Sequence, residues 1–347
     1  MPPVAPTRIL LETSSHCQLR CPSCPTATGA IDAAIGKGFL SASNFEHLLS
    51  HNPALREVEL SNYGEILLNP ELPAILEIAH RHGVIVRADN GVNFNSAPQV
   101  ALEAIVRYGL RSITCSIDGA SPATYAEYRV RGSFDRVIAN IRRLNTLKAA
   151  HASPWPVLTW QFVVFGHNEH ELPAARALAE ELGMLFCTKL SWDSSFSPVR
   201  DRALVAAEFG VASREEFRQA QGRDYMSKIC DQLWDSPQVN WDGRVLGCCR
   251  NFWGDFGANA FEVGVHAAAN SEKMRHARRM LTGKVPARDD IPCTSCDIYK
   301  TRVANADWVR RERVPLIKRA RRALRTLLRV DSLSARFAGR GPRIAAP

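Results

Sequence analysis

Short apolar runs and amphipathic segments alternate along roughly the first 190 residues of the chain. The apolar runs are typical of buried strands and lie at residues 8–12, 58–60, 84–87, 112–117, 158–164 and 185–190. Between them, apolar positions recur at helical spacing at residues 43–50, 73–82, 98–108, 134–147 and 171–182. This alternation predicts an α/β fold in which crossover helices connect the strands of a parallel sheet, either open or curled toward a barrel.

A polar or glycine-containing motif follows each of the first four predicted strands. In chain order these motifs are CQLRCPSC, SNYGEI, DNG and SIDG. Because the carboxyl ends of parallel strands meet at one edge of a sheet, we expect the four loops to lie together. The sequence therefore predicts a functional site at that edge.

The pattern changes near residue 195. The next segment is typical of a connecting loop and helix, and after it two short apolar runs are joined by WDGR, which is a hairpin signal. A further helix is expected near residues 268–281. We therefore predict a strand–helix core, a connection, a smaller unit built from a hairpin and a helix, and a tail, at residues 1–195, 196–228, 229–308 and 309–347.

The net charge of +9 is concentrated in the tail, from Arg310 onward. Apolar residues recur there at helical spacing with basic residues on the remaining face, at Leu316, Ile317, Ala320, Leu324, Leu327 and Leu328 against Lys318, Arg319, Arg321, Arg322, Arg325 and Arg329. Such a basic amphipathic helix fits a solvated helix packed on the domain, or attachment to an anionic membrane surface or an acidic partner. We expect no nucleic acid as a partner, because no aromatic platform or groove-reading motif accompanies the charge.

The amino terminus has no basic segment followed by an apolar stretch of signal-peptide length, and no window approaches the ~20 apolar residues of a membrane span. We therefore expect a cytoplasmic protein, peripheral at the membrane if the tail binds there. Ten cysteines in a reducing compartment indicate metal ligands or catalytic groups more than disulfides. The isolated Cys115 and Cys187 lie in apolar runs and are expected in the core.

Three cysteines follow the first predicted strand at a CxxxCxxC spacing, namely Cys17, Cys21 and Cys24. The chance that ten cysteines produce this spacing by accident is on the order of 1%. A structural zinc site needs four ligands, and His16 is a poor fourth because adjacent residues do not easily reach one ion. Three thiolates on a four-iron cube instead leave one iron open for chemistry.

Four segments in the same order resemble motifs of the radical S-adenosylmethionine (SAM) superfamily. They are the cysteine loop, SNYGEILLNPEL, ADNGV and ITCSIDGASPATYAEYRVRGSFDRVIANIRRL, and the resemblance covers roughly residues 8 to 192. It implies a partial (β/α)6 radical SAM barrel. It also implies a [4Fe-4S] cluster held by Cys17, Cys21 and Cys24, with SAM chelated to the fourth iron.

The resemblance assigns further residues to SAM. Glu65 would bond the amino group, Ser116 and Arg129 would hold the carboxylate, and Asn90 and Asp118 would lie near the ribose or shape the loops. The residues also have plainer interpretations. Asn90 and Asp118 stand beside glycines and fit turn formers, Arg129 fits a surface helix charge, and Glu65 fits a cap for a helix starting near Pro70.

The chain departs from the superfamily pattern at three positions. Ser23 stands where an aromatic residue often packs on the adenine, so the adenine is expected to stack elsewhere or to contact backbone only. Ile66 replaces the usual proline of the second motif, and Asp89 replaces the usual threonine of the third.

The cysteines of the smaller unit resemble those of the SPASM and shorter twitch extensions of the superfamily. Cys230, twelve residues, Gly243, four residues and Cys248 match the opening of that pattern, and CTSC follows. The resemblance implies one auxiliary [4Fe-4S] cluster with the ligands Cys230, Cys248, Cys293 and Cys296. Cys249 competes with Cys248, since adjacent strand residues point in opposite directions. A four-cysteine zinc site is the alternative.

The resemblance to the superfamily implies reductive cleavage of SAM to a 5′-deoxyadenosyl radical, with electrons from a donor such as flavodoxin or ferredoxin. An auxiliary cluster with four cysteine ligands would accept an electron from the substrate, which points to two-electron oxidation of a sugar- or cyclitol-like alcohol. Lys189, at the end of the sixth predicted strand, is a candidate base or substrate contact. The alternatives are maturation of a ribosomally made peptide and, from another class, a zinc-stabilised scaffold whose basic tail binds a membrane or partner.

Overall fold

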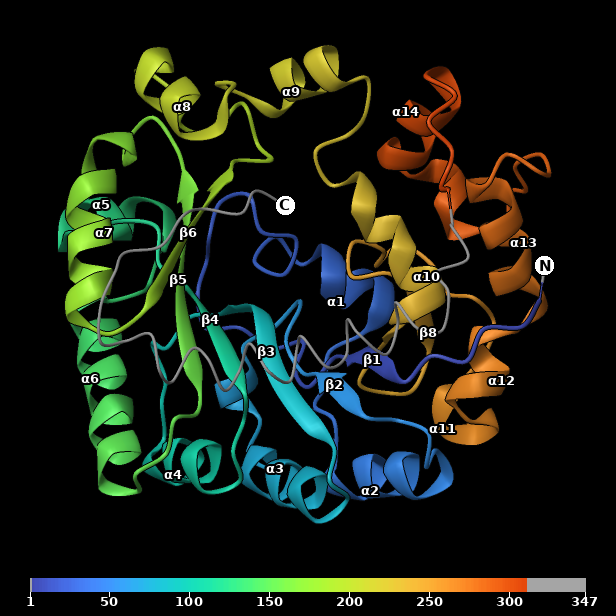
Figure 1. Cartoon of the computed structure of the whole chain (residues 1–347), viewed down its shortest axis with the longest axis horizontal. Helices are drawn as coiled ribbons and strands as arrows, with labels where there is room; N and C mark the ends of the chain where they lie inside the picture. Colours follow the sequence, from blue (N-terminus) through green and yellow to red (C-terminus); the bar gives the residue numbers. More distant parts are fainter. Residues whose placement is uncertain (1, 311–347) are drawn as a thin grey trace, which may run out of the picture. The chain divides into compact units, whose positions relative to one another are not determined.

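The computed structural model describes residues 2–310. Its centre is a sheet with the strand order β6-β5-β4-β3-β2-β1-β7-β8. Strands β1 to β6 run parallel, as expected for strands joined by crossover helices (Figure 1). Their bounds are Arg8–Leu11, Glu57–Glu59, Ile85–Val92, Ser112–Ser116, Val157–Val164 and Leu185–Leu190. The six strands predicted from the apolar runs are therefore confirmed.

Helices connect these strands along one side of the sheet (Figure 1). The five predicted helices correspond to α2 Ala42–His51, α3 Leu72–Arg81, α4 Gln99–Arg107, α6 Phe134–Ala150 and α7 Leu172–Glu181. Two more helices lie in the loops after strands, α1 Ala30–Ile35 and α5 Pro122–Tyr128. The connection carries α8 Arg202–Phe209 and α9 Arg214–Gln221, and the later part of the chain carries α10 Gln232–Asp235, α11 Ala260–Val263, α12 Val265–Ala269, α13 Glu272–Leu281 and α14 Asp297–Ala304.

The two faces of the parallel sheet differ in chemistry. Alternate side chains such as Val86, Trp160 and Phe162 lie in the main hydrophobic core, whereas the intervening positions include Glu59, Gln161 and Lys189. A parallel sheet with both faces packed is apolar on both. The alternation therefore makes the face opposite the core a polar surface, and the polar loops lie at its carboxyl edge.

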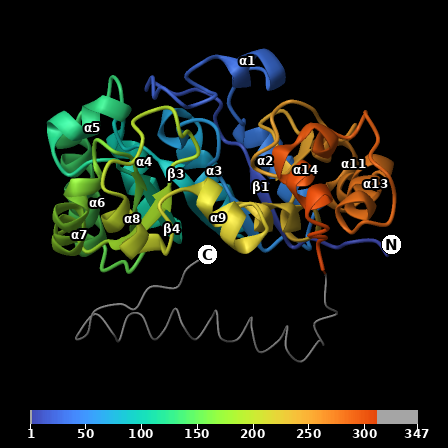
Figure 2. The same cartoon turned by 90° about the horizontal axis from the view of Figure 1, so that it is seen from above.

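The hairpin predicted at WDGR is formed by β7 Gln238–Val239 and β8 Val245–Gly247, which pair antiparallel. Strand β7 also pairs in parallel with β1, with Leu10 opposite Gln238. The hairpin is thus continuous with the sheet of the core. Both views place α11, α13 and α14 at the end of the sheet opposite α6 and α7 (Figure 1, Figure 2).

The helix expected at residues 268–281 is divided in the structure. Helix α12 ends at Ala269, and α13 begins at Glu272 after Ser271, whose hydroxyl accepts a hydrogen bond from the Met274 N–H. Such a side-chain cap stabilises a new helix start and not a continuation. The apolar spacing predicted the helical segment, but it did not reveal the interruption.

None of the helices in residues 2–310 is long and apolar enough to cross a membrane. The basic amphipathic helix predicted at residues 316–329 lies outside the described residues.

Candidate functional site

The CxxxCxxC cysteines lie together in the loop that follows β1. Cys17, Cys21 and Cys24 belong to one small apolar cluster with Leu19 and Tyr128. Burial raises the pKa of Cys17 to about 12, and the neighbouring Cys21 and Cys24 add to this shift. Burial also raises the pKa of Cys21. Thiolates that lie this close together repel each other, so a nearby positive charge favours the ionised forms of Cys17 and Cys21.

The described residues contain no group of three or more His, Cys, Asp or Glu side chains arranged around a single metal ion. A four-iron cube takes each thiolate on a different iron, so its ligands do not converge on one point. Three clustered thiols without a fourth protein donor therefore fit a cube with one open iron and do not fit a closed zinc site.

An ion pair lies beside this loop. The Arg129 guanidinium approaches the Asp118 carboxylate at 2.6 Å and the Cys21 sulfur at 3.9 Å. Its side chain is 13% exposed and that of Asp118 is 0% exposed, so Arg129 is not a surface helix charge. Asp118 also accepts the Val163 N–H at 2.8 Å, which ties the end of β4 to β5. The positive charge of Arg129 lowers the pKa of Cys21 against the effect of burial.

Glu65 is buried at the end of the SNYGEI loop. Its two carboxylate oxygens accept the Leu67 N–H at 3.0 Å and the Asn93 N–H at 2.6 Å. It therefore caps the short 3-10 helix Ile66–Leu68, and not a helix near Pro70. Burial raises its pKa to about 7, while these two backbone bonds act in the opposite direction. Asn93 connects Glu65 to the cysteine loop, because its amide donates to the Cys17 sulfur at 3.7 Å.

Asn90 and Ser116 lie on the neighbouring strands β3 and β4. Asn90 lies inside β3 and donates to the Ser61 carbonyl at 3.0 Å, so it is not a turn former. The register between these strands shifts near Gly91, whose φ is 127°. A Cβ on Gly91 would lie 2.5 Å from the Ser116 hydroxyl oxygen. Glycine at this position thus allows Ser116 to lie against β3, at the edge where the loops meet.

Two buried carboxylates of this region, Glu12 and Glu59, were not identified from the sequence. Glu12 directly follows β1 and accepts the Tyr63 and Gly64 N–H groups at 2.9 and 3.2 Å, which holds the loop that carries Glu65. Burial raises the pKa of Glu12 to about 8. Glu59 on β2 is also buried, and its pKa is raised to about 7, chiefly by burial. The sequence did contain a signal for both residues, because Glu12 ends one apolar run and Glu59 lies within another. Carboxylates are rarely buried, so a charge in such a position indicates a specific role.

Ser23 has a partner that is remote in sequence. Its hydroxyl donates to the Asp193 carboxylate at 2.6 Å, and the Trp192 indole N–H donates to the Ser23 carbonyl at 3.3 Å. Trp192 contacts Tyr128 edge-on, with ring centroids 6.5 Å apart, and is 48% exposed. An aromatic side chain thus lies beside Ser23 although the serine itself offers none. No local motif signals this pairing.

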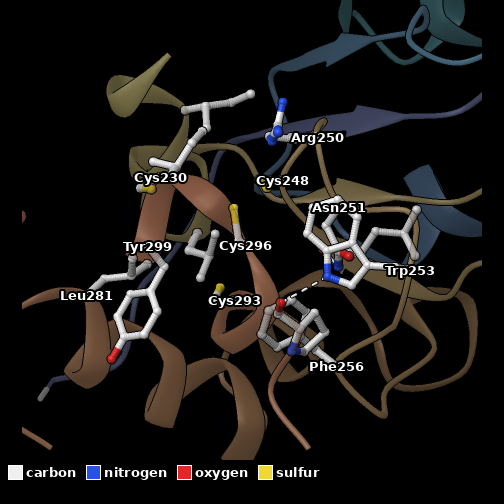
Figure 3. Close-up of a pocket in the computed structure, with 15 residues that line it drawn as sticks. Cys230, Cys248, Arg250, Asn251, Trp253, Phe256, Leu281, Cys293, Cys296 and Tyr299 are labelled. Atoms are coloured by element: carbon white, nitrogen blue, oxygen red, sulfur yellow. Dashed lines mark hydrogen bonds between the residues drawn. The ribbon is translucent and has the colours of Figure 1, made fainter. Parts of the chain in front are cut away.

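The later cysteines form a second set. Cys230, Cys248, Cys293 and Cys296 line one pocket, and Figure 3 shows these four labelled residues around it. Cys293 lies in the 3-10 helix Pro292–Ser295, Cys296 directly follows it, and Cys230 lies in the 3-10 helix Ser227–Asp231. Burial raises the pKa of Cys293, and Cys248, Cys230 and Cys296 raise it further. Four clustered thiols around one pocket fit an iron–sulfur cluster, in which each thiolate binds a different iron.

Cys249 does not line this pocket. Its N–H donates to the Gln232 side-chain oxygen at 2.8 Å, and its sulfur accepts from the Gln232 amide at 3.4 Å. The side chains of Cys248 and Cys249 thus have separate environments. Of the two, only Cys248 joins Cys230, Cys293 and Cys296.

A buried arginine accompanies the second set. Arg302 on α14 is 6% exposed and pairs with Asp307 at 2.9 Å, while it also donates to the Ser227 carbonyl at 2.6 Å. Burial raises the pKa of Cys230 to about 11, and the charge and hydrogen bond of Arg302 oppose this rise. Arg302 therefore favours the thiolate form of Cys230.

Lys189 lies near the carboxyl end of β6, on the polar face of the sheet. Its side chain makes no hydrogen bond or ion pair with another described residue, whereas its backbone pairs with β5 opposite Val163. Burial lowers the pKa of Lys189, and the charge of Arg214 adds to this effect.

The isolated Cys187 precedes Lys189 on the same face of β6 and is only half-buried. The expectation that Cys187 is a core residue is therefore wrong, whereas Cys115 is fully buried. Successive side chains of a strand point to opposite faces of the sheet, so Cys115 lies on the core face and Cys187 on the polar face.

No protein-family model matches the chain, and no curated protein matches it in sequence. Solved structures do match. SuiB of Streptococcus suis bound to S-adenosylmethionine aligns with a TM-score of 0.60 and 13% identity over 85% of this chain and 72% of SuiB. SuiB bound to its precursor peptide SuiA aligns with a TM-score of 0.59 and 12% identity over 85% and 70%.

BtrN in complex with AdoMet and 2-DOIA aligns with a TM-score of 0.49 and 14% identity over 85% of this chain and 94% of BtrN. Because this score is the lower, the fold assignment rests on SuiB. The chain therefore has the fold of SuiB, and the α/β fold class predicted from its strand–helix pattern is confirmed.

Proposed function

We propose that the chain is a radical SAM enzyme that cleaves SAM reductively and oxidises its substrate by two electrons with the help of one auxiliary [4Fe-4S] cluster. The observation that carries this proposal is the presence of two separate sets of clustered thiols in one radical SAM fold. One set has three members and the other has four. This arrangement supports one cluster with an open iron and one cluster with complete protein ligation.

Cys17, Cys21 and Cys24 would hold the first cluster. When bound, this cluster and SAM supply a 5′-deoxyadenosyl radical that removes a hydrogen atom from the substrate. Arg129 lies within reach of the Cys21 sulfur, which supports its proposed contact with the SAM carboxylate. Glu65 is fixed by two backbone bonds, and an ammonium group beside it would favour its charged form.

Cys230, Cys248, Cys293 and Cys296 would hold the auxiliary cluster, which supplies an acceptor for one electron. The oxidation then balances: a CH–OH group loses a hydrogen atom to the radical, a proton to a base and an electron to that acceptor, and becomes a C=O group. Lys189 is the proposed base. Burial and a neighbouring arginine favour its neutral form, which is the form that takes up a proton.

The substrate that we propose is a sugar- or cyclitol-like alcohol, because a single auxiliary cluster is typical of the shorter, twitch-type pattern. A peptide substrate is the second candidate. It is favoured by the structural similarity to SuiB, which has been crystallised with its precursor peptide SuiA. Both candidates need the same two clusters, so the reaction class is tested before the substrate.

The first test is anaerobic reconstitution of the full chain with iron and sulfide. We expect about eight irons per chain and formation of 5′-deoxyadenosine after addition of reductant and SAM. Replacement of Cys17, Cys21 and Cys24 by alanine should leave about four irons and abolish 5′-deoxyadenosine. Cys249→Ser is the matched control and should keep about eight. A protein that carries zinc and no iron, or a triple variant that still makes 5′-deoxyadenosine, would refute the proposal.

A further inference from the structure

An arginine without an acidic partner lies next to the end of β6. The Arg214 Nε donates to the Leu190 carbonyl at 2.9 Å, directly after Lys189, and its guanidinium lies 4.7 Å from the centre of the Tyr225 ring. No carboxylate of the described residues lies within 4.0 Å of its guanidinium nitrogens. Its nearest partners among the described residues are therefore a carbonyl group and an aromatic ring.

Other arginines on this side of the sheet do have acids. Arg129 pairs with Asp118 at 2.6 Å, and Arg87 pairs with Glu57 at 3.1 Å. Arg214 is also half-buried, and burial lowers its pKa, with Tyr225 and Asp224 acting in the opposite direction. An arginine does not lose its proton in a protein. A partly buried guanidinium without an adjacent carboxylate is therefore stabilised when an anion binds to it.

A second arginine increases the local positive charge. Arg250 acts electrostatically on Arg214, and it lines the pocket of the four later cysteines (Figure 3). Its acidic neighbour is Asp297, at 3.8 Å and with a side chain that is 74% exposed. The Nε of Arg250 is buried and has no hydrogen-bond partner. Arg214 is thus hydrogen-bonded to the residue that follows Lys189, and Arg250 lies at the pocket of the second cysteine set.

We propose that Arg214 and Arg250 bind a negatively charged group of the substrate, a carboxylate or a phosphoryl group, next to Lys189. This inference rests on the proposed function, because it names the substrate class for that site. A planar guanidinium binds such anions through two parallel N–H bonds. The anion would take up the positive charge of the two arginines, while the Lys189 amine stays available for the proton.

The test measures binding of inorganic phosphate and of acetate to the reconstituted full chain by calorimetry, at constant ionic strength. We expect saturable binding of at least one of them, with affinity reduced at least tenfold in Arg214→Gln and also reduced in Arg250→Gln. Arg176→Gln is the matched control, because Arg176 also lies over a ring, at 4.8 Å from Phe186, but pairs with Glu208 at 3.0 Å. Its affinity should equal that of the unchanged protein. The anion that binds more tightly identifies the phosphoryl or the carboxyl class.

Equal affinity in Arg214→Gln and the unchanged protein would overturn the inference, as would the absence of saturable binding of either anion. Arg214→Lys keeps the charge if the glutamine variant does not fold, and it should bind more weakly than the unchanged protein. Formation of 5′-deoxyadenosine is measured on the same samples. Arginine-independent binding in a protein that cleaves SAM refutes only this inference, whereas arginine-dependent binding without SAM cleavage refutes only the proposed function.

Discussion

At the scale of single residues, the molecule concentrates buried carboxylates at the edge where the loops meet. Glu12, Glu59, Glu65 and Asp118 are each at most 1% exposed, and each accepts at least one backbone N–H. Backbone donors compensate part of the cost of burying a charge. These residues hold the loops that carry the candidate SAM contacts.

Glu65→Gln tests the proposed contact with SAM. The variant keeps the size of the side chain but loses a negative charge and one acceptor for a backbone N–H. We expect SAM affinity to fall at least tenfold in the reconstituted protein while its iron content stays near eight, as measured by calorimetry and iron analysis. Glu71→Gln is the control, since Glu71 also accepts a backbone N–H, from Ala42 at 2.8 Å, but at an exposed site. Unchanged SAM affinity in the Glu65 variant would remove this residue from the site.

Glu12 predicts a pH dependence of stability. Its pKa is raised from 4.5 to about 8 in the folded chain, so the folded state binds more protons between these values. The free energy of unfolding from this group is therefore largest below pH 4.5 and is lost as pH rises toward 8, by an amount on the order of a few kcal/mol. We expect the melting temperature to fall between pH 6 and pH 8, and to fall less in Glu12→Gln. An equal fall in both proteins would contradict this assignment.

At the scale of elements, the hairpin β7–β8 joins the second cysteine set to the central sheet. Its turn contains Gly243 with φ 89°, and a Cβ there would lie 2.1 Å from the Asn259 side-chain oxygen and 2.7 Å from the Phe261 ring. Asn259 in turn donates to the Asp242 carbonyl at 3.0 Å. The glycine of the SPASM-like spacing is thus required by packing, because any side chain would displace the segment that follows β8.

Gly243→Ala should therefore disturb the auxiliary site and spare the first one. We expect the iron content to fall from about eight toward about four while 5′-deoxyadenosine is still formed. Gly257→Ala is the matched control. Its φ of 66° carries a similar backbone cost, but the nearest atom to a new Cβ is in the flexible Lys273 side chain, at 3.7 Å. The same loss of iron in both variants would mean that backbone strain, and not the close packing at Gly243, is responsible.

At the scale of the whole molecule, the two thiol sets belong to one sheet. The loop after β1 carries the first set, β7 pairs with β1, and Cys248 directly follows β8. The two sets are thus joined by neighbouring strands, but they share no cysteine. We therefore expect that a substitution in one set inactivates that site and leaves the other intact.

Cys293→Ala tests that separation. We expect the variant to form 5′-deoxyadenosine at a rate within about threefold of the unchanged protein, because the first thiol set is intact. It should yield no oxidised substrate, detected by mass spectrometry as a product two hydrogens lighter, since the acceptor of the second electron is impaired. Full substrate oxidation in this variant would show that the auxiliary site is not the electron acceptor.

The sequence by itself determined the fold class, the six parallel strands and the two groups of cysteines. Strand alternation and cysteine spacing are local patterns, so they can be recognised in the sequence before the packing of the chain is known. It also indicated the hairpin at WDGR, because Asp-Gly turns have a local backbone signal.

Tertiary structure alone decided which distant groups meet. The pairing of β7 with β1, the Asp118–Arg129 ion pair and the Ser23–Asp193 hydrogen bond join segments whose separation in sequence carries no periodic signal. The spacing from Gly243 matched Cys248 in the sequence, but the separate environments of Cys248 and Cys249 come from the different neighbours that each side chain meets in the fold.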